Sequence, residues 1–427
     1  MKPTSPWIPT LGLLAGSLLA PPAPATPQEE PASGTDDEAP EQAGDPADTP
    51  RDLSELEWKV FWRNGLRVES EDGDFWIRIG GRLNMDWGTF GSSELEDADG
   101  NPLEDGTFFR RARLELDGLL YGTLRYRAHF EFAGAEVAFR DLWGEWTEVP
   151  LRVGRFREPM GLEANTSSNA LTFLERSVAS ITLTPGRNSG VMYRRPFADD
   201  NAQFFIGAFR QTDEAARAIG DDGAITGRVT WLPYISDDER HLVHLGLAAT
   251  ARNTADAGVP IGVRLEAFFP GRVIDITIPA DAAQTVGAEL AWGAGPWSFQ
   301  TEFLGLDTDG ARAQDAQLWG TYAQFSWFLT GEHRPYKRSR RAFGTITPLE
   351  NFSMEGGGKG AIELAGRWSK SDLTDVPDQG DVFENFTVGA NWYANPSLRV
   401  QLNWIHSVRD RVADDEDLFM ARFQVTF

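Results

Sequence analysis

The strongest constraint on the fold is a strict alternation of apolar and polar residues that recurs along most of the chain. Between Phe75 and Trp87, the apolar positions are Phe75, Ile77, Ile79, Leu83, Met85 and Trp87, and the polar positions are Arg78, Arg82, Asn84 and Asp86. Successive side chains of a β-strand point to opposite faces, so this pattern predicts a strand with one apolar and one charged face. The same alternation marks Leu114–Asp117, Leu124–Phe132, Phe386–Trp392 and Leu398–Trp404. Such strands suit lipid on one side and water on the other.

A soluble β-sandwich also alternates, and the aromatic residues help to separate the two folds. In a sandwich, the 15 Trp and 27 Phe would be spread through the core. Here many tryptophans fall near the ends of the alternating runs, where they would form the interfacial girdles of a membrane barrel. They are Trp76, Trp87, Trp143, Trp146, Trp231, Trp292, Trp297, Trp319, Trp327, Trp392 and Trp404.

The C-terminus has the pattern of a closing, lipid-facing strand. Within Leu418–Phe427, the residues Phe419, Ala421, Phe423, Val425 and Phe427 share one face, and Arg422, Gln424 and Thr426 share the other. A terminal aromatic in this register resembles the signal by which the barrel-assembly machinery recognises outer-membrane proteins. The alternative is a soluble edge strand that ends on Phe by chance.

Short turns such as Gly122-Thr123 and Asn395-Pro396-Ser397 are expected on the periplasmic side, and longer acidic loops on the other.

Composition excludes a helical membrane protein in the body of the chain. Hydrophobic residues make up 41% of the 427 residues and mean hydropathy is -0.36. Beyond the N-terminus, no apolar run approaches the roughly 20 residues that a spanning helix needs. The absence of Cys removes disulfides, thiolate metal sites and Cys nucleophiles.

The N-terminus is predicted to be an export signal. Lys2 supplies a small positive region, Ile8–Ala20 is apolar, and the small residues of Ala23-Pro24-Ala25 suit cleavage. We therefore expect a signal peptide over residues 1–25; a single membrane anchor is the alternative, opposed by the shortness of the apolar stretch. Residues 26–52 are rich in Pro, Ala and acid, which predicts a disordered tether, and residues 53–427 form the predicted barrel domain.

Several segments resemble one known family, the phosphate-selective porins O and P. The segments that match best are Gly154–Glu163 (GRFREPMGLE), Thr166–Asn169 (TSSN), Leu171–Arg176 (LTFLER) and Pro185–Val191 (PGRNSGV). Supporting segments are Asn64–Arg67 (NGLR), Gly80–Arg82 (GGR), Phe109–Leu114 (FRRARL) and Gly287–Leu290 (GAEL). The resemblance extends over about Leu53–Phe427.

The resemblance implies an all-β outer-membrane barrel of sixteen antiparallel strands, trimeric, with a long loop folded into the lumen and a ladder of arginines that guides anions. The protein would reach the outer membrane through the periplasm and act as a porin for small anions such as phosphate. Its partners would be outer-membrane lipid and lipopolysaccharide, two further copies of itself and the barrel-assembly machinery. No nucleic-acid partner and no cofactor are expected.

The residues themselves also predict an ordered loop between two strands. Leu151–Phe156 has the pattern of a strand, and no strand pattern follows from Glu158 to Asn188. Ser167 or Ser168 is placed to cap a helix over Ala170–Arg176. So long a connection is functional or disordered by default, and an inward constriction loop is preferred here over an extracellular lid. The constriction-loop candidates are Glu158, Glu163, Ser167, Ser168, Glu175, Arg176 and Arg187, with the glutamates expected to fix the loop through ion pairs.

Arginine supplies most of the basic charge. Of the 40 basic residues only Lys2, Lys59, Lys337, Lys359 and Lys370 are lysines. A guanidinium binds phosphate or carboxylate with two donors and stays charged, so arginines on successive polar faces can pass an anion along a pore. The pore-lining candidates are Arg78, Arg82, Arg111, Arg113, Arg125, Arg127, Arg152, Arg228 and Arg367. The alternative role for each is to neutralise neighbouring acids. Arg110 and Arg155 fall in register with the apolar residues of their strands. We therefore expect them at an interface or beside a bulge.

The net charge of -24 works against an anion pore, because acidic mouths would lower the anion concentration at the entrance. The chain also has few lysines from which to form the lysine-rich funnel that phosphate-selective members of the family are expected to have. A non-selective or weakly cation-selective porin, and a structural barrel plugged by its loop, therefore stay open as alternatives.

Enzymatic function is not expected. The five histidines, His129, His241, His244, His333 and His406, lack metal-ligand spacing, and no metal site is predicted. Gly356–Gly360 lacks the strand-to-helix context of a phosphate-binding loop and is expected to be a loop hinge.

Overall fold

The computed structural model describes residues 52–91, 96–102, 104–134, 136–218, 220, 222–254, 257–268, 271–310, 315–411 and 414–427. The predicted signal peptide, and the predicted tether apart from Asp52, lie outside the described residues. None of the described helices is long and apolar enough to cross a membrane.

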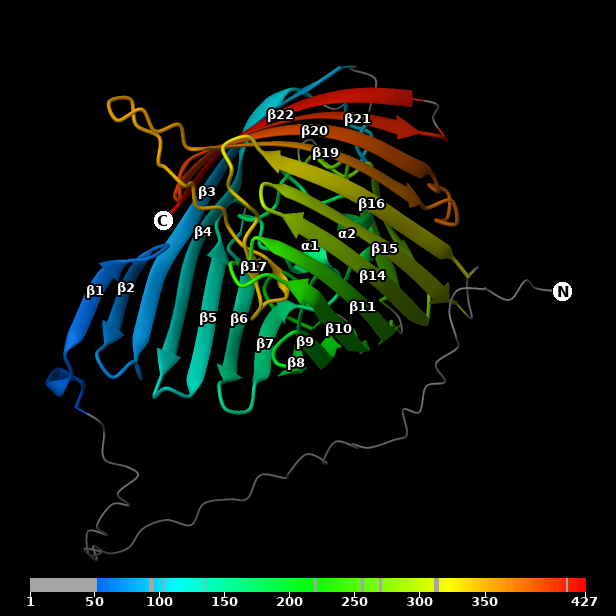
Figure 1. Ribbon diagram of the computed structural model, residues 1–427. Helices are drawn as coiled ribbons and strands as arrows, with labels where there is room; N and C mark the ends of the chain where they lie inside the picture. The colour runs from blue at the N-terminus through cyan, green and yellow to red at the C-terminus, as the bar shows by residue number, and fades with distance from the viewer. Residues whose placement is uncertain are drawn as a thin grey trace, which may run out of the picture. The chain divides into compact units, whose positions relative to one another are not determined.

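Sixteen of the described strands pair antiparallel and close into one barrel (Figure 1). In chain order they are β3 (Trp76–Phe90), β4 (Gly106–Leu120), β5 (Leu124–Glu131), β6 (Ala138–Trp146), β7 (Leu151–Arg157), β8 (Arg187–Phe197), β9 (Ala202–Arg210), β10 (Gly223–Ile235), β11 (His241–Asn253), β14 (Ala282–Ala294), β15 (Trp297–Asp309), β16 (Gln317–Phe328), β19 (Ala361–Asp372), β20 (Val382–Asn395), β21 (Leu398–Arg409) and β22 (Asp414–Thr426). Pairing of β22 with β3 closes the ring. Because each strand has two partners, no backbone edge is left within the wall.

The predicted alternation is confirmed along the barrel wall. On β22, Phe419 and Phe423 are exposed on the outer face, whereas Arg422 is fully buried inside. At the C-terminus, the backbone N–H of Phe427 donates to Gly81 O at 3.0 Å, and Gly81 N–H donates to Phe427 O at 2.6 Å. The terminal aromatic therefore sits where the last strand joins the first, as the sequence predicts.

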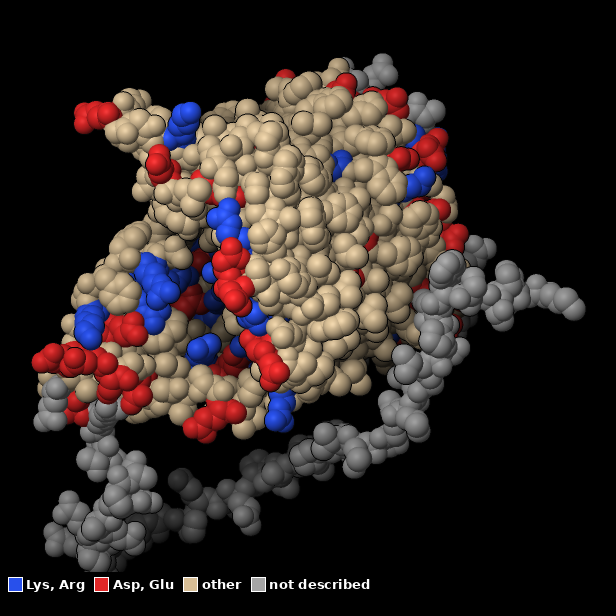
Figure 2. All heavy atoms as spheres, viewed as in Figure 1, with Lys and Arg blue, Asp and Glu red and all other residues tan. Residues whose placement is uncertain are grey.

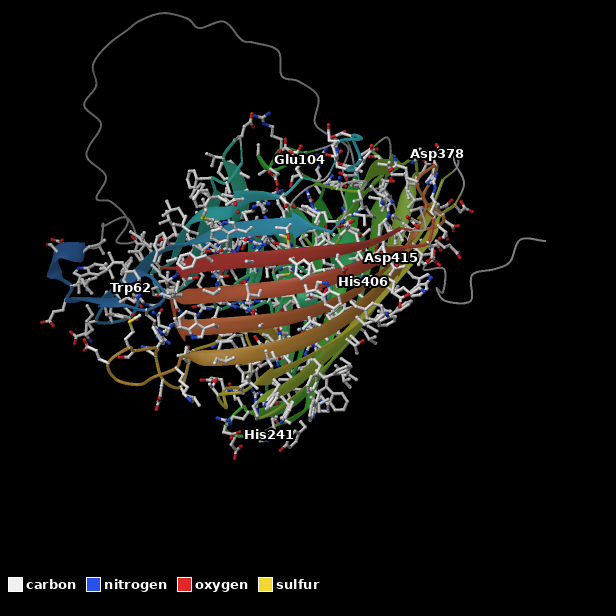
Figure 3. The ribbon with its side chains drawn as sticks, turned by 90° about the horizontal axis from the view of Figure 1, so that it is seen from above. Trp62, Glu104, His241, Asp378, His406 and Asp415 are labelled. Carbon is white, nitrogen blue, oxygen red and sulfur yellow. The ribbon has the colours of Figure 1, made fainter. Side chains whose placement is uncertain are left out.

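A hairpin of β1 (Trp58–Trp62) and β2 (Leu66–Ser70), preceded by the 3₁₀ helix η2 (Leu53–Glu55), continues the sheet beyond the barrel. The first part of β3 pairs with β2, from Trp76 to Ile79, and the rest pairs with β22. Figure 3 places Trp62 of β1 at one end of the barrel and Glu104, Asp378 and Asp415 at the other.

The two ends of the barrel differ in their connections. The end that holds β1, β2 and the C-terminus has mostly short turns, such as residues 121–123 and 396–397. The opposite end carries longer loops, among them residues 254–281 with the hairpin β12 (Val259–Val263) and β13 (Ile274–Ile278). One exception is residues 329–360, a long connection at the short-turn end that includes β17 (Tyr336–Lys337) and β18 (Ala342–Phe343).

The long connection between β7 and β8 folds into the lumen. It contains α1 (Leu162–Asn165) and α2 (Val178–Leu183), and nearly all of its residues are buried. The predicted helix over Ala170–Arg176 is wrong, because this segment is not helical. Instead Ser177 caps α2, with its side chain accepting a hydrogen bond from Ser180 N–H.

The non-helical segment has its carbonyl groups satisfied by side chains of the barrel wall. Arg399 donates to Leu171 O at 2.8 Å, and Asn391 donates to Thr172 O at 2.9 Å. Arg422 donates to Leu174 O at 2.6 Å. Since these partners replace the intrahelical bonds that buried carbonyls would otherwise need, the segment can remain non-helical.

Not every tryptophan of the predicted girdles faces lipid. Trp87, Trp146, Trp231, Trp292, Trp297, Trp327 and Trp404 have exposed side chains. Trp76 and Trp143, in contrast, line the cavity inside the barrel. Successive side chains of a strand point to opposite faces. Trp143 is an odd number of positions from Leu142 and Trp146, which face outward, so its own side chain points into the barrel.

Candidate pore lumen

A cavity of about 1060 Å³ occupies the lumen, and arginine is the most frequent residue in its lining. Its lining reaches from Asn395 and Ser397 at the short-turn end to Glu214 and Arg272 in the loops at the other end. Among the described residues, 20 arginines and Lys337 line it, against five carboxylates. Figure 2 shows basic side chains gathered in a hollow with acidic side chains along its rim. The lumen is therefore strongly positive although the whole chain is acidic.

Eight of the nine predicted pore arginines line this cavity, namely Arg78, Arg82, Arg111, Arg113, Arg125, Arg127, Arg152 and Arg228. Most of them also pair with acids of the wall. Arg78 donates to Glu115 at 3.0 Å and also contacts Asp117, and Arg113 donates to Glu131 at 2.5 Å. The structure thus combines both expected roles, because a residue can line the lumen and still neutralise an acid.

Two predicted arginines are locked in place. Arg228 forms a two-pronged ion pair with Glu289, at 2.8 and 2.6 Å. Arg367 does not line the cavity; it is buried between Glu266 and Glu163, the latter at 3.3 Å. A guanidinium with both edges occupied in this way positions a loop rather than receiving a solute.

Two β-bulges bring additional charges into the lumen. Between β3 and β4, Asn84 pairs with Arg111 while Met85 pairs with Phe109, which leaves Arg110 as an extra residue. Arg110 and Arg111 consequently both contact Glu175 inside the barrel, which confirms the expectation of a bulge at Arg110.

The second bulge lies between β5 and β6, where Ala128 pairs with Leu142 and Phe130 pairs with Phe139. Arg140 and Asp141 both line the cavity as a result. Arg140 was not predicted. The sequence signal is the same at both bulges. Two consecutive polar residues stand between apolar residues and interrupt the period-two alternation.

Glu175 is the main anchor of the inward loop. Its carboxylate accepts hydrogen bonds from Arg110 at 2.8 Å, Arg111 at 3.3 Å and Arg422 at 2.8 Å. Burial alone would raise the pKa of Glu175, but Arg110, Arg111 and Arg422 hold it well below its ordinary value. The carboxylate is therefore charged, and two strands, β4 and β22, are tied to one loop residue.

The other predicted loop glutamates are also buried and bonded. Glu158 accepts from Asn188 at 2.6 Å and from Arg252 at 2.5 Å. Glu163 accepts from the N–H and hydroxyl of Ser177, at 3.0 and 2.8 Å. These contacts fix the loop, in keeping with the structural role expected for the glutamates.

The two predicted serines differ. Ser168 accepts a hydrogen bond from Arg82 at 2.9 Å, so it links the loop to β3. The Ser167 hydroxyl accepts from Asn169 N–H at 3.4 Å, its carbonyl accepts from Ala170 N–H at 2.8 Å, and the residue lines the cavity.

A group of arginines with few counter-charges lies where the loop meets β7 and β8. Arg187 donates to Asp141 at 2.9 Å. Arg176 donates only to backbone oxygens, Glu163 O at 2.9 Å and Thr166 O at 2.7 Å. Arg157, which was not predicted, has no side-chain partner among the described residues and lines the cavity. These guanidinium groups are the best placed to receive an anion.

The connection at the short-turn end also enters the lumen. The Tyr336 hydroxyl lies 2.8 Å from His244 Nδ1, and the buried Arg341 donates to Gln203 at 2.9 Å and Asp200 at 2.5 Å. These bonds hold Lys337 and Arg340 against the cavity. Gly356–Gly360, the expected hinge, lies near the end of this connection.

One cluster has the composition of a metal site. Ligand atoms of Glu115, Asp117 and His129 lie within 4.8 Å of one another. Arg78 and Arg82 already contact Glu115, and Arg127 donates to Asp117. A cation would have to displace these guanidinium groups, so the cluster is better described as an ion-pair network.

The sequence matches the family model described as phosphate-selective porin O and P over residues 77–427. The chain belongs to this family. Porin O of Pseudomonas aeruginosa is 27% identical over 413 residues, which cover 86% of this chain and 91% of that protein. An uncharacterized protein of Caulobacter vibrioides is 24% identical, covering 81% of this chain and 71% of its own length.

Solved structures share the fold. The anion-selective porin from Comamonas acidovorans aligns with a TM-score of 0.52 at 13% identity, over 83% of this chain and 100% of that porin. The outer-membrane channel DcaP of Acinetobacter baumannii aligns with a TM-score of 0.52 at 11% identity, over 84% and 99%. This porin is an outer-membrane channel protein and not an enzyme.

Proposed function

We propose that this porin lets small anions such as phosphate diffuse passively across the outer membrane, guided by lumen arginines and narrowed by the inward loop. The observation that carries the proposal is the charge of the lumen lining, 20 arginines and one lysine against five carboxylates. The family and the porin fold support the channel, and the lining supports its selectivity.

Electrostatics explains why the local charge outweighs the net charge of -24. Two unit charges 4 Å apart interact by about 4 kcal/mol at an effective dielectric of 20, but charges beyond about 8 Å are screened by physiological salt. Acids on the outer loops therefore act weakly on an ion inside the barrel. Arginines spaced along the cavity can each hold an anion briefly and release it to the next.

The test is ion selectivity of the purified protein in planar bilayers under a salt gradient. The reversal potential should favour chloride over potassium, and phosphate should reduce the chloride current. Silent insertion would support a plugged barrel, and a reversal potential of the opposite sign would support the weakly cation-selective alternative.

Replacing Arg157 and Arg176 by Gln should weaken anion selectivity several-fold while the barrel still folds, because neither side chain bonds a carboxylate. The reversal potential of the double variant checks this. Arg195 is the matched control, since its strand neighbour Arg194 lines the cavity whereas Arg195 is exposed. If R195Q changed selectivity as much as the double variant, the lumen arginines would not be the cause.

We further propose that the protein is exported with its signal peptide, residues 1–25, removed, assembled by the barrel machinery and embedded in lipid and lipopolysaccharide as a homotrimer. The intact mass of protein from outer membranes should lack about residues 1–25, and unheated samples should migrate as trimers on gels. Retention of the N-terminus would contradict processing.

A further inference from the structure

An apolar patch interrupts the arginine-rich wall of the lumen. Phe156 on β7, Met192 on β8 and Phe205 on β9 form one buried cluster, and Trp143 on β6 packs against it. All four side chains line the cavity. Phe156, Met192 and Phe205 are at most 6% exposed, so the partly exposed ring of Trp143 is the part of this patch that the lumen reaches.

Guanidinium groups flank the ring of Trp143. The Arg152 guanidinium carbon lies 4.0 Å from the ring centroid, and that of Arg127 lies 5.2 Å from it. Arg152 also pairs with Glu145 at 2.9 Å, and Arg127 lies 3.8 Å from Asp141. Arg127 also donates to Asp117, so each of these guanidinium groups gives part of its edge to an acid. A guanidinium carries five N–H donors, so the donors that these acids leave open remain beside the ring of Trp143.

Arg340 supplies a cation that forms no ion pair among the described residues, although Asp117, Asp141 and Glu115 act on its charge. It belongs to the connection that enters from the short-turn end, lines the same cavity and has no side-chain partner among the described residues. Burial, together with the positive charge of Arg127, lowers the pKa of Arg340 to about 10. It therefore stays charged at neutral pH and lies close enough to Arg127 for the two charges to interact.

We propose that Trp143 and Met192, with Arg127, Arg152 and Arg340, form a subsite for small aromatic anions, in which the ring of the solute lies on the apolar wall and its anionic group on the guanidinium edges. The proposal rests on the function proposed above and deepens it, because it names a class of solute.

Block of the chloride current measures this binding. Phenyl phosphate and methyl phosphate carry the same head group and differ in the ring, so their comparison isolates the apolar wall. Stacking on an aromatic side chain adds to the binding of a ring, and we expect a half-blocking concentration about tenfold lower for phenyl phosphate. Equal block by the two esters would overturn the proposal.

Two tryptophans of β6 provide matched variants, because Trp143 lines the cavity and Trp146 is exposed on the outer face. In W143A, phenyl phosphate should lose its advantage while block by methyl phosphate is unchanged; W146A should behave as the wild type. Equal effects of both variants would overturn the subsite. If W143A does not fold, as judged by its heat-dependent gel shift, M192A takes its place.

The reversal potential measured with chloride alone distinguishes a failure of the aromatic-anion subsite from a failure of the proposed anion channel. A cation-selective wild type would overturn the anion channel itself. An anion-selective wild type that blocks equally with both esters would overturn only the aromatic subsite.

Discussion

The arginines inside the barrel fall into two groups: those whose guanidinium groups are bound by acids, and those whose guanidinium groups are not. Arg422 is bound by Asp86 at 2.6 Å and by Glu175 at 2.8 Å, and Arg228 by Glu289. Arg125, Arg157 and Arg340 have no side-chain partner among the described residues, yet all three line the cavity. The first group ties strands and loops together, and the second is the group to which the proposed function assigns contact with solutes. Sequence alternation places a side chain inside the barrel but does not reveal whether an acid from another strand reaches it.

Glu175→Gln should loosen the inward loop. Removing one partner of a buried ion pair costs about 3–5 kcal/mol, and here three arginines would lose their shared acid. We expect larger and noisier single-channel currents from E175Q. Unchanged currents would show that the carbonyl bonds of residues 171–174 suffice to hold the loop.

The pH dependence of this anchor follows from the direction of the shift. The pKa of Glu175 is held well below its ordinary value, so its stabilising contribution is fully present above about pH 4.3, the ordinary value for Glu, and is lost only as the pH falls through the lowered pKa. Wild-type conductance should therefore be steady from about pH 7 to pH 5. A change of conductance within this range would point to another titrating group.

At the scale of elements, the strands follow from local sequence and the loops do not. Period-two alternation predicts β3, β5, β20, β21 and β22, because lipid and water impose opposite demands on the two faces of each strand. Interruptions of the period mark the bulges at Arg110 and Arg140. The helix expected over 170–176 is absent because wall side chains satisfy its carbonyls, and those partners are more than two hundred positions away in sequence.

Deleting Arg110 should remove the β4 bulge without shifting the pairing on either side of it, because Phe109 and Arg111 already face Met85 and Asn84. We expect the deletion variant to fold and to keep its heat-dependent gel shift, with Glu175 bound by Arg111 and Arg422 but no longer by Arg110. R110A, which keeps the bulge, is the control. If the deletion abolished folding while R110A folded, the bulge itself would be required.

At the scale of the whole molecule, charge is segregated. The chain carries 64 acidic residues, of which five line the described cavity, whereas 20 arginines line it. Closing the sheet places the polar faces of sixteen strands around one space, so basic residues far apart in sequence act together. This arrangement reconciles an acidic chain with a positive lumen.

Closure of the barrel also makes the last residue important. Phe427 exchanges two backbone hydrogen bonds with Gly81. Deleting Phe427 removes both and shortens the outward apolar face, so we expect several-fold less protein assembled in the outer membrane. Folded protein in membrane fractions measures this, and the conservative variant F427Y should assemble nearly normally. Equal yields of the deletion variant and the wild type would show that the terminal aromatic is dispensable.

The sequence by itself determined that the chain forms a β-barrel and that arginines such as Arg78 and Arg127 face its interior, because both follow from the two-residue period of a strand. Only the tertiary structure decided which arginines are free. Pairing with Glu115, Glu175 and Glu289 depends on contacts across strands and loops, and a local pattern carries no information about such contacts. Trp143, expected in the lipid-facing girdle, lies in the lumen wall because of its place in the strand alternation, and the tertiary structure adds its neighbours Arg127 and Arg152 from adjacent strands.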